Sequence, residues 1–350
     1  NQLPYWKSVS WEGFPYRNDA YIVDLNSGER TQFGENIRGS LSLSPGANYV
    51  TWFSSPDTVW MAYSIGSKQT IQLTNNSQVS FSNEQHDSPS LPGSYGIAGW
   101  LEGDRYALIY DRYDIWKVDA SGKEAPKKLT EGRENKVRYR YIRLDREDRF
   151  INPDEQVLLH VFDENTKASG YAHWSVNGGN PKVILKEDYN YTSRPMKAKD
   201  ADRLIFTKQS FQVFPDYWYS NGSFQNAKRV SDANPQQSDY YWGSNELYQW
   251  TDLNGNTLTG MLYYPENFDP SKKYPMIVNF YERSSDRLHS HRPPSPGRST
   301  INYSFYLSRG YVIFNPDVPY RVGYPGESSL NAVVSGVTAI INDGFVDKER

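Results

Sequence analysis

Tyr281 is the residue in this sequence whose position most strongly suggests a part in chemistry. It closes the uncharged run from Met276 to Phe280, and the polar segment from Glu282 to Asp286 follows it. The run predicts a short strand buried on both faces, as in a parallel sheet covered by helices. Because the chemistry of open α/β sheets gathers at the carboxyl ends of strands, the Tyr281 hydroxyl is a candidate hydrogen-bond donor there. The alternative is a rim tyrosine whose ring packs and whose hydroxyl contacts water.

A serine nucleophile would be recognised by the pattern G-x-S-x-G, which places it on a sharp strand-to-helix turn. No such pattern exists in the 350 residues. The nearest candidate is Ser328 in the segment 326–330, which lacks the second glycine and opens an expected helix, where serine more often caps. The sequence therefore offers a candidate hydrogen-bond donor but no pattern for a nucleophile.

The histidines and the basic segments favour structural roles. His289 and His291 have the spacing of a metal-binding pair, but no third ligand lies at a suitable distance in the sequence, so we expect both to be solvated and predict no metal and no cofactor. The alternating cations and aromatics of the segment 138–143 are typical of a strand with one solvated face rather than of a nucleic-acid site.

The elements around Tyr281 follow the order hairpin, strand, helix, strand, helix. Two runs at 247–252 and 257–265 flank an Asn-Gly turn and predict the hairpin. The segment 303–308 predicts a short helix that Gly310 ends, and 311–315 predicts a second buried strand. Apolar residues at helical spacing from Leu330 to Asn342 predict a long helix, with Gly344 as its stop signal.

This C-terminal part, about residues 245–350, resembles the opening of the catalytic domain of the prolyl oligopeptidase family of serine peptidases. The matching pieces are Asp252-Leu253-Asn254-Gly255, Leu262-Tyr263-Tyr264-Pro265, Tyr274-Pro275-Met276-Ile277-Val278, Tyr281, Ser308-Arg309-Gly310-Tyr311, Asn315-Pro316-Asp317 and Gly344-Phe345-Val346-Asp347. The resemblance implies that Tyr281 donates a hydrogen bond to the oxyanion. Many family members have a glycine-rich run after this tyrosine, whereas this chain has Glu282-Arg283-Ser284-Ser285.

Residues 1 to about 240 repeat a pattern of an alternating strand, a Gly or Asn turn and a second strand that ends near Thr or Ser. The repeats lie near 20–31, 59–74, 114–130, 172–185 and 216–231. Their spacing of about 45–55 residues fits four-stranded propeller blades, of which we count about five, the first incomplete. A β-sandwich with coincidental turns is the alternative. The 28 tyrosines and 10 tryptophans suit a domain rich in half-buried strands.

We therefore predict a partial all-β propeller at 1–244, followed by the N-terminal part of an α/β-hydrolase domain at 245–350. The resemblance implies hydrolysis of short peptides through an acyl-enzyme, with the catalytic triad beyond Arg350. We expect a separate chain or a neighbouring copy to supply the remaining hydrolase strands, and the strand around Ile313 to be buried only when that chain is included.

Composition excludes some other classes of function. The net charge of −3 and the pI near 6.0 argue against a nucleic-acid partner. No apolar run is long enough to span a membrane, and the absence of cysteine excludes disulfides while leaving the compartment open. Two alternatives to the peptidase remain: a non-catalytic propeller-based binding protein or degenerate hydrolase, and a propeller glycosidase, which would need two facing carboxylates.

Overall fold

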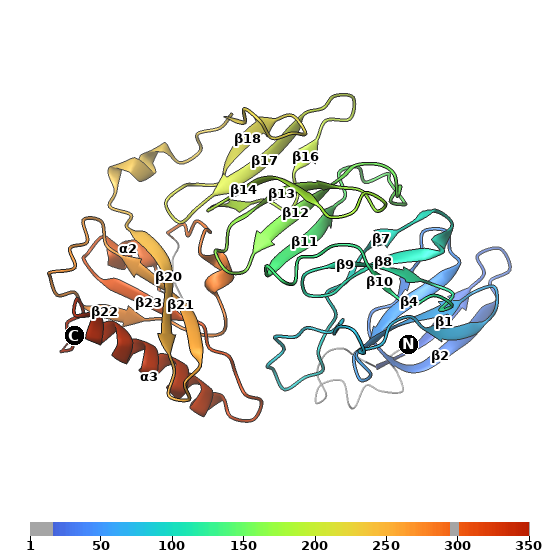
Figure 1. Cartoon of the computed structure of the whole chain (residues 1–350), viewed down its shortest axis with the longest axis horizontal. Helices are drawn as coiled ribbons and strands as arrows, with labels where there is room; N and C mark the ends of the chain where they lie inside the picture. The colour runs from blue at the N-terminus through green and yellow to red at the C-terminus, as the bar shows by residue number, and fades with distance from the viewer. Residues whose placement is uncertain (1–16, 295–300, 350) are drawn as a thin grey trace. The chain divides into compact units, whose positions relative to one another are not determined.

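The computed structural model describes residues 17–294 and 301–349, which form a series of antiparallel sheets followed by one mixed sheet with two helices (Figure 1). The chain divides into two compact units. One contains residues up to Val161 together with Tyr171–Val183, and the other contains Phe162–Gly170 and the chain from Ile184 onward. The predicted boundary between 244 and 245 lies inside the second unit, just after the start of a strand at Ser244, and remains a prediction.

Five sheets precede that strand and account for the five predicted blades. The first has two described strands, β1 (Arg17–Val23) and β2 (Arg30–Arg38). The next three have four strands each: β3 (Ser42–Leu43), β4 (Tyr49–Ser54), β5 (Val59–Ser64) and β6 (Gln69–Gln72); β7 (Ile97–Trp100), β8 (Tyr106–Tyr110), β9 (Ile115–Asp119) and β10 (Lys127–Lys128); and β11 (Val137–Ile142), β12 (Val157–Asp163), β13 (Ser169–Trp174) and β14 (Lys182–Glu187). A short 3-10 helix, η2 (Glu102–Asp104), connects β7 to β8.

The fifth sheet has five strands: β15 (Asn190–Tyr191), β16 (Met196–Lys197), β17 (Leu204–Gln209), β18 (Asp216–Ser220) and β19 (Lys228–Arg229). The repeated four-stranded antiparallel sheets confirm the predicted propeller architecture, in which each blade is a small sheet of consecutive strands.

A side-chain hydroxyl explains why the repeats end near Thr or Ser. The Thr or Ser lies two residues past the end of the last strand, and its oxygen accepts a backbone N–H near the start of the preceding strand: Trp60 to Thr74 at 2.9 Å, Ile115 to Thr130 at 3.0 Å and Tyr217 to Ser231 at 2.9 Å. In two repeats the hydroxyl donates in turn to an aspartate, Asp114 or Asp216. The hydroxyl thus satisfies a backbone donor where the short last strand no longer pairs.

The mixed sheet has the strand order β20-β21-β23-β22 and matches the predicted order of elements (Figure 1). A 3-10 helix, η3 (Pro235–Asp239), precedes the hairpin of β20 (Ser244–Thr251) and β21 (Thr257–Tyr264). β22 (Met276–Val278) is followed by the 3-10 helix η4 (Ser285–Arg287), α2 (Tyr303–Leu307), β23 (Val312–Pro316) and α3 (Pro325–Asp343). Gly344 ends α3 in the left-handed region at φ 93°, as its position predicted.

Burial in this sheet differs from the expectation in two places. β22 is only partly buried because it is the last strand of the described sheet, so this chain by itself does not cover it on both faces as predicted. β23 is fully buried within this chain, with Val312, Ile313 and Phe314 at 0% exposure, because β21 and β22 flank it and α2 and α3 contact it. The expectation that Ile313 needs a second chain for its burial is therefore wrong.

The segment 138–143 also differs from the expectation. We expected one face of this strand to be solvated, but Arg140 on that face is half-buried against the ring of Tyr110. Its guanidinium donates to the carbonyl oxygens of Asp111 at 3.1 Å and Arg112 at 2.8 Å. The aliphatic stem and the planar head of arginine allow this packing, which a pattern of alternating charge does not reveal.

Candidate active site

Tyr281 lies beyond the carboxyl end of β22, at the edge where the parallel strand β23 also ends. Its side chain is 79% exposed, so its hydroxyl faces solvent rather than the core. The backbone beside it is fixed, since the Tyr320 hydroxyl donates to the Tyr281 carbonyl oxygen at 2.6 Å. The sequence thus predicted correctly that Tyr281 follows a strand, and the exposed side chain leaves its phenol available to a ligand.

Asp317 holds the loop that follows Tyr281. Its Oδ1 accepts the backbone N–H of Ser284 at 2.6 Å and of Ser285 at 2.9 Å, and its Oδ2 accepts the Ser285 hydroxyl. Three hydrogen bonds to this one carboxylate satisfy two backbone donors at the start of the η4 turn. This rigid polar turn stands where many peptidases of the resembled family have glycines.

Asn315 and Tyr303 form a second, more deeply buried layer of the same network. The Asn315 side-chain N–H groups donate to the Asn279 carbonyl oxygen at 2.7 Å and to the Tyr303 hydroxyl at 2.8 Å. The Asn279 amide donates to the same hydroxyl at 2.9 Å, and the Ser284 hydroxyl donates to Asn315 Oδ1. These hydrogen bonds therefore join β23 to the chain on both sides of Tyr281, at Asn279 and Ser284.

A third attachment joins the loop to residues 162–170 of the same unit. The ammonium of Lys167, a largely buried residue, lies 2.9 Å from the carboxylate of Asp286. His289 Nε2 lies 3.1 Å from the Thr166 carbonyl oxygen, and burial, the largest effect on this ring, lowers the pKa of His289. A largely buried ammonium needs its carboxylate partner, so this pair helps to fix the position of the loop.

The prediction that both histidines are solvated is wrong for His291, which is buried, whereas His289 is half-buried. His291 stacks on Trp242 with ring centroids 5.0 Å apart, and its Nε2 lies 2.9 Å from Gln237 Oε1. Among the described residues, no group of three His, Cys, Asp or Glu side chains is arranged to hold a metal ion. No helix in residues 17–294 and 301–349 is long and apolar enough to cross a membrane.

Sequence reasoning missed several residues that position Tyr281: Asn279, Tyr303, Asn315 and Tyr320. Asn315 and Asp317 belonged to a matched motif, but nothing in that motif indicated which side chains face the Tyr281 loop. The sequence did contain one signal for these contacts. Asn279 follows β22 and Asn315 lies near the end of β23, and polar residues that end two adjacent parallel strands meet at the same edge of the sheet.

Comparison with solved structures reveals the same architecture in three peptidases. A Bacteroides ovatus protein named as a dipeptidyl aminopeptidase IV has a TM-score of 0.64 and 14% identity, with 96% of this chain and 52% of that chain covered. Porphyromonas gingivalis dipeptidyl peptidase 4 has a TM-score of 0.63 and 13% identity, with 96% of this chain and 48% of that chain covered. A post-proline cleaving enzyme from Rickettsia typhi has a TM-score of 0.57 and 12% identity, with 95% of this chain and 50% of that chain covered.

The chain has the fold of the prolyl oligopeptidase family. The resemblance predicted from the sequence is thus confirmed, because the similar structures are serine peptidases of that family. No family model and no curated protein matches the sequence, as the low identities lead one to expect. The chain spans about half the length of the solved structures it matches, so the activity of a whole protein of this fold is a separate question.

Proposed function

We propose that this chain is the propeller and the first part of the hydrolase domain of a serine peptidase that cleaves short peptides through an acyl-enzyme. The observation that carries the proposal is the exposed hydroxyl of Tyr281 on a loop whose backbone Asp317 and Tyr320 hold in place. Oxyanion stabilisation needs a donor that is already oriented before the charge develops, and a tyrosine on a fixed loop meets that need.

In this proposal Tyr281 donates to the oxyanion of the tetrahedral intermediate, together with a backbone N–H next to the serine nucleophile. The serine, aspartate and histidine of the triad come from sequence beyond the segments described here, because the 350 residues contain no G-x-S-x-G. The propeller restricts access to short or unfolded peptides. The reaction uses no metal and no organic cofactor.

The partly buried strand β22 supports the proposal that further hydrolase strands join this sheet. Its outer edge has no described neighbour, and Phe280 beyond it is also exposed. An apolar edge of this kind pairs readily with another strand. We propose that the partner is the rest of the hydrolase domain, supplied as a continuation of this chain, a separate chain or a neighbouring copy.

A serine-directed phosphonate tests the proposal. We expect stoichiometric labelling of the complete protein and no labelling of the 350-residue chain alone. Labelling of the chain alone would place a reactive serine within it and contradict the assignment of the nucleophile.

The second candidate is a non-catalytic propeller-based binding protein or a degenerate hydrolase, and the lack of a nucleophile pattern in the chain favours it. A complete protein that takes no label and cleaves no peptide would establish that alternative. The propeller glycosidase is less well supported, because the mixed sheet and its helices match the peptidase fold.

A further inference from the structure

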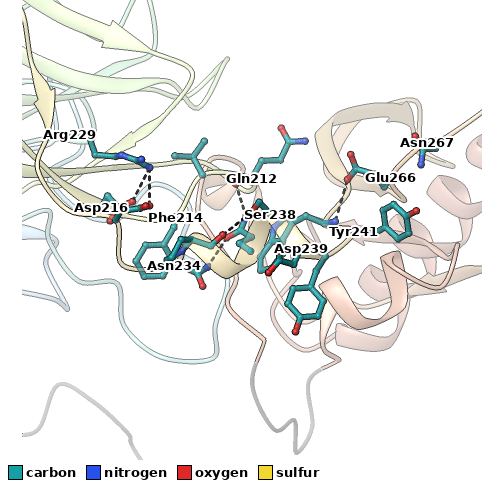
Figure 2. Close-up of a pocket in the computed structure, with 16 residues that line it drawn as sticks. Gln212, Phe214, Asp216, Arg229, Asn234, Ser238, Asp239, Tyr241, Glu266 and Asn267 are labelled. Atoms are coloured by element: carbon teal, nitrogen blue, oxygen red, sulfur yellow. Dashed lines mark hydrogen bonds and ion pairs between the residues drawn. The ribbon is translucent and has the colours of Figure 1, made fainter.

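The segment 234–242 connects β19 to β20 and lines two adjoining cavities in the second unit. The larger has a volume of about 1070 Å³ (Figure 2) and the smaller about 580 Å³, and Tyr240, Tyr241 and Trp242 line both. Sites for single small molecules usually measure roughly 300–1,000 Å³. Two adjoining cavities with a shared wall therefore suit an extended ligand of several residues better than one small molecule.

The shared wall presents exposed aromatic rings on a rigid base. Tyr240 is 69% and Tyr241 is 63% exposed, whereas Trp242 is buried. The Trp242 indole N–H donates to the Phe211 carbonyl oxygen at 2.7 Å, and the backbone N–H of Gly243 donates to Glu266 at 3.0 Å. Large aromatic side chains held in this way are typical anchors of peptide interfaces, because little conformational entropy is lost when they bind.

The side chain of Gln237 holds the turn that precedes the two tyrosines. The Gln237 amide donates to the Gln212 carbonyl oxygen at 2.7 Å, and its oxygen lies 2.9 Å from Nε2 of His291. Burial lowers the pKa of His291, so this support is uncharged at neutral pH. The cavity wall therefore keeps its shape without a bound ligand.

Arg309 is the one residue with a formal charge among the described residues that line the smaller cavity. Its guanidinium lies 3.5 Å from the ring centroid of Phe305, and Nη1 donates to the Phe305 carbonyl oxygen at 3.0 Å. No described carboxylate pairs with it, and its Nε and Nη2 groups make no hydrogen bond to the described residues. An oriented guanidinium with two unused donors is suited to a carboxylate.

We propose that these cavities bind the C-terminal end of a peptide, with its free carboxylate on Arg309 and its apolar or aromatic side chains on Tyr240 and Tyr241. Asn234 and Gln237 also line both cavities, and the Asn234 amide donates to Gln237 Oε1 at 2.9 Å, which helps to hold this wall in place. The site is independent of the proposed cleavage, because neither Tyr281 nor a serine nucleophile takes part in it.

The test uses the complete protein after treatment with a serine-directed phosphonate, so that peptides are not cleaved. The probes are acetyl-Pro-Pro-Tyr-Phe with a free carboxylate and the same peptide with a C-terminal amide, and the measurement is titration calorimetry. We expect the free acid to bind about 10-fold more tightly than the amide, the usual effect of one charged hydrogen-bonding pair.

Three variants separate the expected contacts. Arg309→Ala should abolish the difference between acid and amide, whereas Tyr240→Ala should weaken both peptides. Arg321→Ala is the matched control, since Arg321 is an exposed arginine that pairs with Glu327 and should leave binding unchanged. Circular dichroism confirms that each variant is folded. Equal binding of acid and amide, or no binding of either at about 1 mM, would overturn the proposal.

Discussion

Asp317, just after β23, accepts the backbone N–H of Ser285 at 2.9 Å, and Ser285 begins η4 at the end of the loop that follows the neighbouring strand β22. This hydrogen bond joins that loop to the end of β23 through a side chain. Because Tyr281 lies in the same loop, the contact limits the positions that Tyr281 can adopt.

Asp317→Ala should loosen the loop without unfolding the sheet. The change leaves the N–H groups of Ser284 and Ser285 without their acceptor, at a cost of about 1–3 kcal/mol in unfolding free energy. Faster amide hydrogen exchange confined to residues 282–288 is the expected signature. Asp317→Asn keeps one acceptor oxygen and should have a smaller effect. Unchanged exchange in the alanine variant would show that Asp317 does not hold the loop.

Asp252 should make the stability of the mixed sheet depend on pH. Burial raises the pKa of Asp252, but hydrogen bonds from Asn256, Asn331 and Asn254 outweigh that effect and lower it to about 2. Because the pKa is lower in the folded state, the stabilisation is present above the unfolded value near 3.9 and is lost as pH falls towards 2.

We therefore expect Asp252→Asn to lower the melting temperature at pH 7, and the difference from the unmodified protein to vanish between about pH 4 and pH 2. Asp200→Asn is the control, since Asp200 is an exposed aspartate between β16 and β17. A difference in melting temperature that persists at low pH would mean that the carboxylate charge is not the cause.

Gly336 should gain no stability from an added side chain, although it lies inside α3. A Cβ atom there would lie 2.7 Å from the Phe314 ring and 3.0 Å from Trp250. Alanine gains about 1 kcal/mol in helix propensity over glycine, but overpacking a core costs about 1–3 kcal/mol. Gly336→Ala should therefore destabilise the protein or at best leave its stability unchanged in denaturant titration.

The matched control is Gly326→Ala in the first turn of the same helix, where a Cβ would meet nothing within 4 Å. This change should be neutral or stabilising. If both variants were stabilised equally, the close packing of α3 on β23 would not be a constraint on the sequence.

The sequence predicted the elements of this protein well because their signals are local. The Asn-Gly turn between β20 and β21, the apolar spacing of α3 and Gly344 at its end all act within a few residues. The blade repeats were recognisable for the same reason, since each strand pair and its closing Thr or Ser lie close together in the chain.

Burial and contacts between distant residues were harder to predict. β22 is apolar whether it is an inner strand or an edge strand, so its sequence does not report its place in the sheet. His291 and Arg140 looked solvated because their partners, Trp242 and the carbonyls near Asp111, lie about 30 to 50 residues away in the chain. The contact of Asp317 with the Tyr281 loop likewise depends on how two strand ends meet.

The central claim is that Tyr281 stabilises the oxyanion, and the most direct measurement is the kcat of Tyr281→Phe in the complete protein with a chromogenic peptide. Tyr217→Phe, an exposed tyrosine on β18, is the control and should be unchanged. We predict that Tyr281→Phe keeps its KM and its melting temperature but loses about 10²–10³ in kcat, the usual effect of one missing oxyanion donor. A kcat equal to that of the unmodified protein would contradict the claim and leave Tyr281 as a rim residue.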